Sequence, residues 1–244
     1  MNLALPRRAA AEFAGTALLV AAVVGSGIAA ARLSPDDVGL QLLENAIATA
    51  LALGALILTF GPVSGAHFNP VVSAVDWWLG RRAGTGLTPR DLAAYTGAQV
   101  TGAIAGAILA DLMFGLPAVT FSGTARTGGN LWLAEVVATA GLVVLIFALA
   151  RSGRSAAAPA AVGAYIGAAY WFTSSTSFAN PAVTIGRAFT DTFAGIMPTS
   201  VPGFVAAQLA GGLLAVAALA LWYPDSGDAA DAVVVPRLGE EENR

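Results

Sequence analysis

Long apolar blocks, separated by short stretches that hold most of the charges, dominate the hydrophobic pattern of this chain. Each block holds roughly 20 residues, which is enough for an α-helix to cross a hydrocarbon core of about 30 Å. Gly61-Pro62 is expected to end the second block. The pattern predicts six membrane spans, at about residues 9–31, 38–60, 91–114, 131–150, 156–172 and 203–223.

Two further apolar segments are too short to cross a bilayer, and each begins with an Asn-Pro pair. They run from Asn69 to about Leu79 and from Asn180 to about Phe193. Asn is a good N-cap and Pro is favoured at the first helical position, so each pair predicts a helix start. Unpaired backbone groups at membrane depth are tolerated only inside protein or along a watery cavity. The two segments are therefore predicted to be re-entrant half-helices that line a cavity.

The chain contains an internal repeat. Residues 64–73 align with residues 175–184 at a spacing of 111, and two further landmarks recur in the same order, Glu12 with Glu135 and Gln99 with Gln208. Each copy holds three spans, an odd number, so the second copy must enter the membrane in the opposite orientation. We expect an inverted repeat of residues 9–114 and 131–223, with Asn69 and Asn180 meeting near the bilayer midplane.

Composition supports a membrane protein, since 57% of the 244 residues are hydrophobic, 11% are charged and the mean hydropathy is +0.72. There is no cysteine and one histidine, so no metal site and no cofactor are expected. The first block lacks a clear cleavage site and is interpreted as a permanent helix, with an uncleaved signal-like role left open. The net charge of −3 indicates no partner, and nucleic acid is not expected to be one.

The arginines indicate the orientation of the chain. With a cytoplasmic N-terminus, the inner loops hold seven arginines, and the outer side holds Arg32, Arg126 and Arg187. Residues 1–223 are expected to form one channel-like domain. Residues 224–244 are polar and acidic and are predicted to be a disordered cytoplasmic tail. The seven inner arginines are Arg7, Arg8, Arg81, Arg82, Arg90, Arg151 and Arg154.

Over about residues 9–223 the chain resembles the major intrinsic protein family, the aquaporins and aquaglyceroporins. The resemblance rests on the stretch Ser64 to Val71, on Asn180-Pro181-Ala182, and on the early glutamates Glu12 and Glu135. It implies an all-α fold of six transmembrane helices and two half-helices. It also implies a homotetramer with one pore per subunit in a bacterial inner (plasma) membrane, passing water or small uncharged solutes. The expected pore midplane comprises Asn69, Pro70, Val71, Asn180, Pro181 and Ala182.

Two positions depart from the family pattern. Val71 replaces the usual Ala of the first triplet, and Val183 stands where most relatives have a filter arginine. The family comparison places the other selectivity-filter positions at Thr49, Ala168 and Ser177, none of them charged or aromatic. Such a filter implies a wide pore for glycerol-like polyols or neutral metalloid acids such as arsenite. A water-selective aquaporin is the alternative.

Arg187 follows Val183 by one helical turn, about 5.4 Å toward the outer mouth. One hypothesis is that it supplies a displaced positive charge in the outer vestibule, and the other is that it pairs with Asp191. Its repeat mate Asp76 is expected to face the inner mouth.

Three other polar residues have two interpretations each. Glu12 and Glu135 could carry protons, but bracing the half-helix loops by hydrogen bonds is the favoured interpretation. His67 could sense pH, although bracing of its loop is again favoured.

Other function classes fit the sequence less well. A secondary transporter also uses inverted repeats, but it would need ionisable pairs at the midplane, where this chain has amides. A membrane enzyme would need a nucleophile, a base and an orienting group, which these residues do not supply. The glycine-rich piece at residues 123–129 lacks the context of a phosphate loop.

Overall fold

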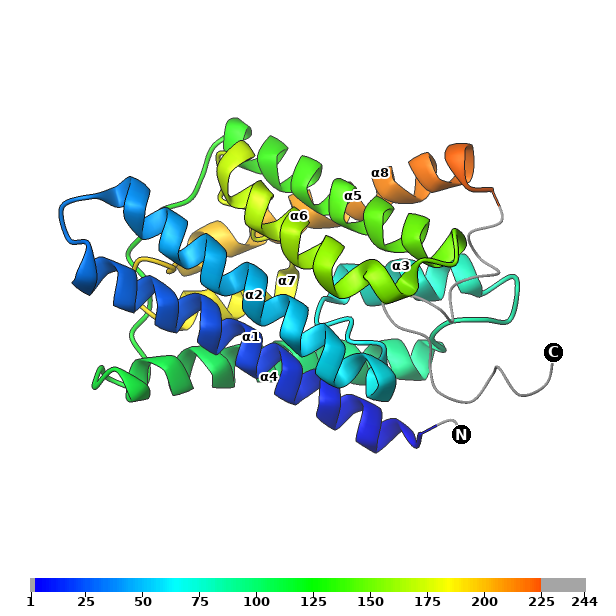
Figure 1. The fold of residues 1–244 in the computed structure, drawn as a ribbon, viewed down its shortest axis with the longest axis horizontal. Coiled ribbons are helices and arrows are strands. Elements are labelled where there is room, and N and C mark those ends of the chain that lie inside the picture. Colours follow the sequence, from blue (N-terminus) through cyan, green and yellow to red (C-terminus); the bar gives the residue numbers. More distant parts are fainter. Residues whose placement is uncertain (1–2, 225–244) are drawn as a thin grey trace.

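The computed structural model describes residues 3–224, and all of their regular structure is helical (Figure 1). The predicted tail at residues 224–244 lies, apart from Pro224, outside the described residues. Within residues 3–224, eight α-helices and three short 3₁₀ segments follow one another. They are α1 (Leu5–Leu33), α2 (Val38–Ser64), α3 (Pro70–Gly80), α4 (Pro89–Met113), α5 (Gly129–Arg151), η1 (Ser155–Ala157), α6 (Ala158–Phe172), α7 (Pro181–Gly186), η2 (Arg187–Phe189), η3 (Pro198–Ser200) and α8 (Val201–Trp222).

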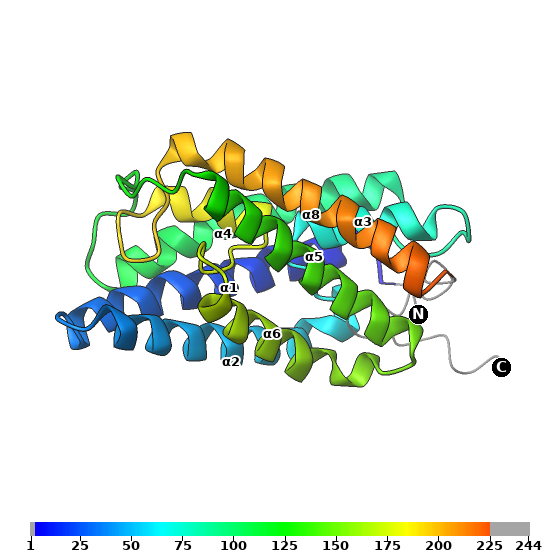
Figure 2. The ribbon, with the colours of Figure 1, turned by 90° about the horizontal axis from the view of Figure 1, so that it is seen from above.

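The helices pack as two equivalent halves. In the first half α1 packs against α2 and α4, and in the second half α5 packs against α6 and α8. Each half-helix also reaches across the boundary, because α3 contacts α8 and α7 contacts α4. The long helices run roughly side by side in both views, with the starts of α1 and α4 and the end of α8 at the same end of the bundle (Figures 1 and 2). The inverted repeat and the aquaporin-like all-α fold expected from the sequence are confirmed.

Small residues bring the paired helices close together. A Cβ atom at Gly102 of α4 would lie 2.4 Å from the carbonyl oxygen of Phe13 in α1, and one at Gly106 would lie 2.1 Å from that of Ala17. The second half repeats this contact, since a Cβ at Gly211 of α8 would lie 2.6 Å from the carbonyl oxygen of Val136 in α5. Backbones can approach this closely only where no side chain intervenes, as is typical of membrane helix pairs.

In the part of the chain that the structure describes, five helices are long and apolar enough to cross a membrane, namely α1, α2, α4, α5 and the segment Pro198–Trp222. The remaining span, α6, has 15 residues, and η1 adds three residues directly before it. At 1.5 Å per α-helical residue and about 2 Å per 3₁₀ residue, the two together extend about 28 Å, close to the hydrocarbon thickness. The outer surfaces of the bundle expose large apolar side chains, among them Leu51, Leu213 and Leu221, which suits contact with lipid.

Two predicted boundaries were wrong. Helix α2 does not end at Gly61-Pro62 but continues through Pro62 to Ser64, where Gly65 ends it with φ +87°. An interior proline is tolerated in a membrane helix because neighbouring groups satisfy the freed carbonyl. Helix α7 is shorter than predicted, because regular helix ends at Gly186 and the 3₁₀ turn η2 ends at Phe189 rather than near Phe193.

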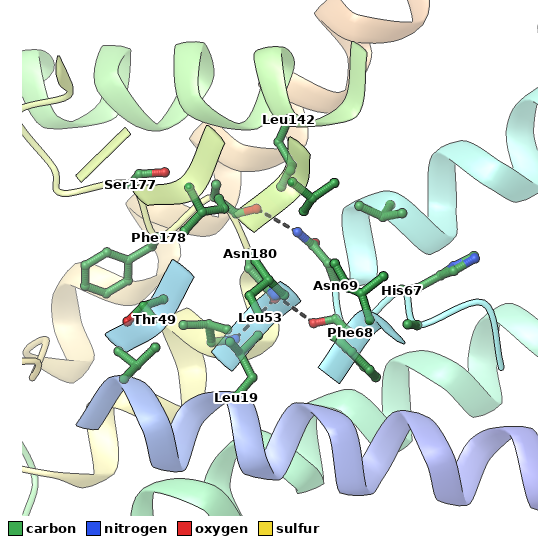
Figure 3. A pocket seen from close by; sticks show the side chains of 18 of the residues that line it. Leu19, Thr49, Leu53, His67, Phe68, Asn69, Leu142, Ser177, Phe178 and Asn180 are labelled. Atoms are coloured by element: carbon green, nitrogen blue, oxygen red, sulfur yellow. Dashed lines mark hydrogen bonds between the residues drawn. The ribbon is translucent and has the colours of Figure 1, made fainter. Parts of the chain in front are cut away.

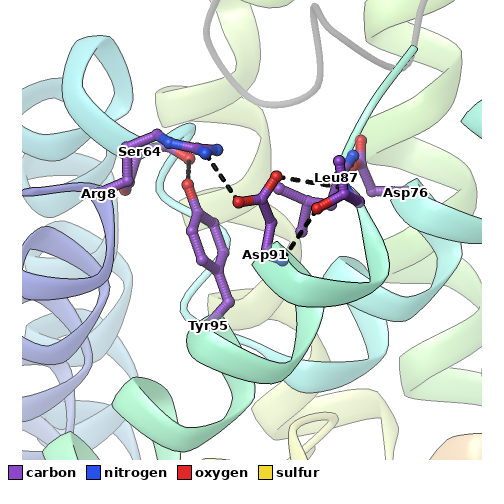
Figure 4. A network of polar contacts seen from close by, with 7 residues as sticks. Arg8, Ser64, Asp76, Leu87, Asp91 and Tyr95 are labelled. Carbon is purple, nitrogen blue, oxygen red and sulfur yellow. Dashed lines mark hydrogen bonds and ion pairs between the residues drawn. The ribbon is translucent and has the colours of Figure 1, made fainter. Parts of the chain in front are cut away.

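A polar network ties the helices together at the end where α1 begins (Figure 4). Arg8 Nη2 lies 2.8 Å from Asp91 Oδ1 of α4, the one ion pair found within residues 3–224. The Arg8 guanidinium also lies over the ring of Tyr95, at 5.8 Å from its centroid. Tyr95 in turn donates its hydroxyl to the carbonyl oxygen of Ser64 at 2.7 Å. The ion pair, the stacking and the hydrogen bond therefore hold α1 and α4 against the end of α2. There the first of the two asparagine loops begins, which are residues 65–69 and residues 173–180.

Candidate functional site

A narrow cavity of about 60 Å³ lies inside the bundle, where the two asparagine loops meet (Figure 3). One part of its wall is apolar and comes from helices α1, α2, α5 and α6. The polar part comes from the loops, which bring Asn69 and Asn180 together. Thr49 and Ser177 lie on one side of the asparagine pair and His67 lies on the other (Figure 3). The lining is Leu19, Val23, Thr49, Leu53, Ile57, Ala66, His67, Phe68, Asn69, Val72, Leu142, Ile146, Val162, Ile166, Tyr170, Ser177, Phe178, Ala179, Asn180, Val183 and Arg187.

The two asparagines lock the loops to each other. Asn69 Nδ2 donates to the carbonyl oxygen of Ala179 at 2.7 Å, and Asn180 Nδ2 donates to that of Phe68 at 2.6 Å. Their side-chain oxygens cap the half-helices, Asn69 Oδ1 accepting from Val71 N and Asn180 Oδ1 from Ala182 N, both at 3.0 Å. An amide NH₂ group has two hydrogens, so each asparagine keeps one donor beyond the lock.

The backbone of each loop adopts the left-handed region at residues other than glycine. Ala66 and Phe68 have φ near +49°, and their repeat mates Ser177 and Ala179 have φ values of +51° and +49°. This region costs free energy for residues with a side chain, and it persists only where the surroundings hold it. The structure therefore needs a brace behind each loop.

Two buried glutamates lie behind the loops and do not line the cavity. Glu12 accepts hydrogen bonds from the backbone N–H groups of His67 and Phe68, at 3.0 and 2.7 Å, and from Ser64 Oγ and Gln99 Nε2. Four donors thus converge on one carboxylate, which is a charge-assisted arrangement.

Glu135 repeats the same four contacts in the second half. It accepts from the N–H groups of Phe178 and Ala179, at 2.9 and 2.8 Å, and from Ser175 Oγ and Gln208 Nε2, at 2.6 and 2.7 Å. All four partners donate to the carboxylate, and Glu135 itself is absent from the cavity wall. The contacts suit a brace of the second loop.

His67 lines the cavity on the side opposite Thr49. Its Nδ1 lies 3.1 Å from Ser73 Oγ, and its ring packs edge-on against Tyr95. The other members of the two triplets lie behind the lining, because Pro70, Val71, Pro181 and Ala182 are absent from the cavity wall. A Cβ at Gly212 of α8 would lie 2.6 Å from Val71 Cγ1, so the valine occupies the space that this glycine leaves.

Three of the four predicted filter residues line the cavity, and one does not. Thr49, Ser177 and Val183 are all buried and form part of the wall. Ala168 is exposed on the outside of α6, so its assignment to the filter was wrong. Val162, Ile166 and Tyr170 occupy the inner face of α6 at four-residue intervals, and a residue two positions from Tyr170 points to nearly the opposite side.

Tyr170 takes the place that the sequence comparison gave to Ala168. Its hydroxyl lies 3.2 Å from Thr49 Oγ1, so the two hydroxyls hydrogen-bond to each other at the wall. An aromatic side chain therefore lies beside Thr49 in the cavity wall, where the sequence had suggested none. The four-residue spacing of Val162, Ile166 and Tyr170 was a signal in the sequence that could have identified this tyrosine.

Arg187 lines the cavity and does not pair with Asp191. Its Nε donates to the carbonyl oxygen of Ala194, and its guanidinium stacks on the ring of Phe178 at 3.4 Å from the centroid. Asp191 instead accepts from the backbone N–H of Gly123 at 2.9 Å. Between the two hypotheses for Arg187, pairing with Asp191 is excluded by these contacts.

Asp76 does not face the inner mouth as expected. Its side chain is buried, lies outside the cavity wall, and accepts from the backbone N–H of Leu87 at 2.7 Å. It thereby holds the chain that connects α3 to α4 (Figure 4).

A second arginine near the cavity was not singled out from the sequence. Arg126, in the connection between α4 and α5, lies over the ring of Phe178 at 5.2 Å from the centroid. It donates through Nε to the carbonyl oxygen of Gly195 and through Nη2 to that of Phe193. Burial lowers the pKa of the Arg126 guanidinium by removing water from it. Nothing in the local sequence indicates the contact between Arg126 and Phe178, since 52 residues separate them along the chain.

Comparison with known proteins identifies the family of the chain. A family model described as Major intrinsic protein matches residues 2–177. The aquaglyceroporin AqpS of Rhizobium meliloti (strain 1021) is 57% identical over 213 residues, which cover 87% of this chain and 88% of that protein. The probable aquaporin AqpM of Archaeoglobus fulgidus is 31% identical over 223 residues, covering 80% and 88%.

A solved structure supports the same fold. The X-ray structure of the aquaglyceroporin from Plasmodium falciparum matches with a TM-score of 0.64 and covers 91% of this chain and 97% of the other. Its sequence identity is 18%, so the likeness concerns the arrangement of the helices alone.

Proposed function

Because the chain belongs to the major intrinsic protein family of membrane channels, we propose that it passes small uncharged solutes larger than water. The solutes best suited to this pore are glycerol-like polyols and neutral metalloid acids such as arsenite in its hydroxide form. The relative named aquaglyceroporin AqpS supports the polyol class.

The observation that carries the proposal is Val183 in the cavity wall, where most relatives place the filter arginine. The same wall holds the hydroxyl of Ser177, which has no hydrogen-bond partner among the described residues. An apolar wall faces the carbon skeleton of a polyol, while Ser177, Thr49 and the free amide hydrogens of the asparagines can bind its hydroxyls. The pore is thus amphipathic along its length.

Charge keeps ions out in this proposal. The half-helices α3 and α7 point their N-termini at the asparagine pair, and each N-terminus carries about half a positive charge. Arg187, one turn beyond Val183, adds a full positive charge to the outer part of the cavity without occupying the filter position. A cation meets repulsion at both places, whereas a neutral solute does not.

A water-selective pore is the second candidate, and Tyr170 is the observation that favours it. The tyrosine ring and its hydrogen bond to Thr49 add bulk to the filter, where the sequence had suggested none. Water permeation with exclusion of polyols would follow if this pair leaves too little room.

Assembly and orientation follow the family in this proposal. We infer a homotetramer with one pore per subunit in a bacterial plasma membrane. The end of the bundle where α1 begins is assigned to the cytoplasm, because the connections there hold Arg81, Arg82 and Arg154 and the first turn of α4 holds Arg90.

Stopped-flow light scattering on proteoliposomes tests the solute class, using water, glycerol, urea and arsenous acid in turn. We expect rapid, non-saturating flux of glycerol and arsenous acid through the wild-type protein. Val183→Arg should stop both solutes while leaving water flux measurable, and Val183→Ala, the matched control, should keep both. Water flux without solute flux in the wild type would establish the second candidate, and saturable uptake driven by an ion gradient would indicate a transporter.

A further inference from the structure

Two arginines share one aromatic ring at the outer end of the cavity. Arg187 and Arg126 stack on Phe178, with their guanidinium carbons 3.4 Å and 5.2 Å from the same ring centroid. These distances place the two carbons at most 8.6 Å apart. Like charges this close repel each other unless a negative group compensates them.

No carboxylate contacts either guanidinium within residues 3–224. Their hydrogen bonds go to the carbonyl oxygens of residues 193–195, which are neutral. Asp191 is bound to Gly123 N and Asp111 to the hydroxyl of Thr190. Glu135, the buried carboxylate behind the second loop, accepts hydrogen bonds from its own four donors. The pair thus carries positive charge that no side chain neutralises by contact.

Arg187 and Ser177, which both line the cavity, have hydrogen-bond donors that the described residues leave unused. A guanidinium has five N–H groups, and the side chain of Arg187, although the residue is only 3% exposed, makes one hydrogen bond to the described residues, through Nε. Arg187 lines the cavity, and so does Ser177, whose buried hydroxyl has no partner among the described residues. The hydroxyl of Tyr170 is part of the same wall. A guanidinium group and hydroxyl groups in one wall provide the hydrogen-bond donors from which planar oxygen anions accept.

We propose that the outer end of the channel holds a binding site for a small monovalent oxyanion, formed by Arg187 and Ser177 and supported electrostatically by Arg126. The bound anion accepts two hydrogen bonds from the terminal nitrogens of Arg187 and one from Ser177 Oγ. It lies in the path of neutral solutes and therefore slows them while it is bound. The site goes beyond solute permeation, and it relies on the proposal above only for its readout by flux.

Nitrate is a suitable probe because it is planar, monovalent and has no neutral form near neutral pH. We would measure glycerol and water flux in proteoliposomes while potassium nitrate replaces potassium chloride at constant ionic strength. Wild-type flux is expected to fall with nitrate concentration and to saturate. Isothermal titration of nitrate into the detergent-solubilised full chain measures the same binding without requiring any flux, so a failure of the solute proposal can be distinguished from a failure of this one.

Three variants assign the effect to the site. Arg187→Gln should raise the nitrate concentration for half-block about tenfold or more, because it removes a charge-assisted hydrogen-bond donor. Ser177→Ala should raise it about threefold, and this change breaks no hydrogen bond of the folded chain. Arg32→Gln is the matched control, because Arg32 also stacks on a phenylalanine, Phe114, but lies outside the cavity wall. It should leave the block unchanged.

Each outcome decides the question. Nitrate block and binding that weaken in Arg187→Gln and Ser177→Ala, but not in Arg32→Gln, would establish the site. If Arg187→Gln does not fold, the Ser177→Ala and Arg32→Gln pair still gives the answer. The absence of saturable nitrate binding to the wild-type protein, or equal block in all variants, would overturn the proposal.

Discussion

Glu135→Gln tests whether the buried carboxylates hold the loops in their strained conformation. The change keeps the size and shape of the side chain but replaces one acceptor oxygen by an NH₂ donor. Ser175 can reverse its hydroxyl and accept from that group, so the new nitrogen is expected on the Ser175 side. Phe178 N, which now bonds to that same oxygen at 2.9 Å, would then lose its acceptor.

The expected cost can be worked from the four contacts. An orphaned buried N–H costs about 1–3 kcal/mol, and each of the three remaining bonds weakens by roughly 1 kcal/mol when its acceptor becomes neutral. A buried amide is easier to desolvate than a carboxylate, which offsets part of this loss. We therefore expect a destabilisation of at least about 3 kcal/mol, equivalent to a fall in Tm of about 6–12 °C for a chain of this size.

Thermal unfolding in detergent, followed by tryptophan fluorescence, measures the stability, and stopped-flow light scattering measures water permeability in proteoliposomes. Both should fall in Glu135→Gln, since the second asparagine loop loses a backbone contact. Glu44→Gln serves as the control, because Glu44 accepts one hydrogen bond, from Ser34 Oγ, far from either loop. The bracing argument would be refuted by unchanged water flux together with a Tm within about 2 °C of wild type, a shift that corresponds to less than about 1 kcal/mol for a chain of this size.

Three further predictions concern the asparagine lock, the helix contacts and the outer charge. Asn180→Ala removes the cap of α7 and the bond to Phe68 O, so a loss of about 2–3 kcal/mol and of most water flux is expected in the same two assays; flux equal to wild type would contradict the role of the lock. Gly106→Ala places a methyl group 2.1 Å from Ala17 O and should lower the Tm by several degrees, whereas Gly97→Ala, with open space around its Cβ, should not. Arg187→Ala should raise potassium leak, measured by a fluorescent dye in proteoliposomes, and an unchanged leak would remove the charge-barrier hypothesis.

The fold was predictable because a membrane permits few kinds of backbone structure. Backbone groups in hydrocarbon must be satisfied within a helix, so apolar block length alone located the spans. The pairing of Glu12 with Glu135 identified the two halves before any contact was known. The end of α2 was missed because a Gly-Pro pair that would stop a helix in water is tolerated in a membrane helix.

The filter was less predictable than the fold. Ser177 and Val183 are fixed by their short distance from Asn180, so counting residues placed them in the wall. Ala168 lies 12 residues before Asn180, and helix α6 ends between them. The spacing from Asn180 therefore does not show which face of α6 Ala168 occupies. The rotation of α6 is set by its packing against α2 and α5, which turned Tyr170 inward and Ala168 outward.

The sequence by itself determined the helices, their inverted duplication and the two asparagine loops, because these depend on local pattern and on spacing along the chain. Only the tertiary structure decided which side chains share the wall of the cavity. Tyr170 meets Thr49 across 121 residues, and Arg126 meets Arg187 on Phe178 from a separate connection. Such encounters depend on helix rotation and on the paths of long connections, which no local pattern specifies. Val183 lies at the filter position of the family comparison and also lines the cavity, so its substitution is the sharpest test of which solutes pass.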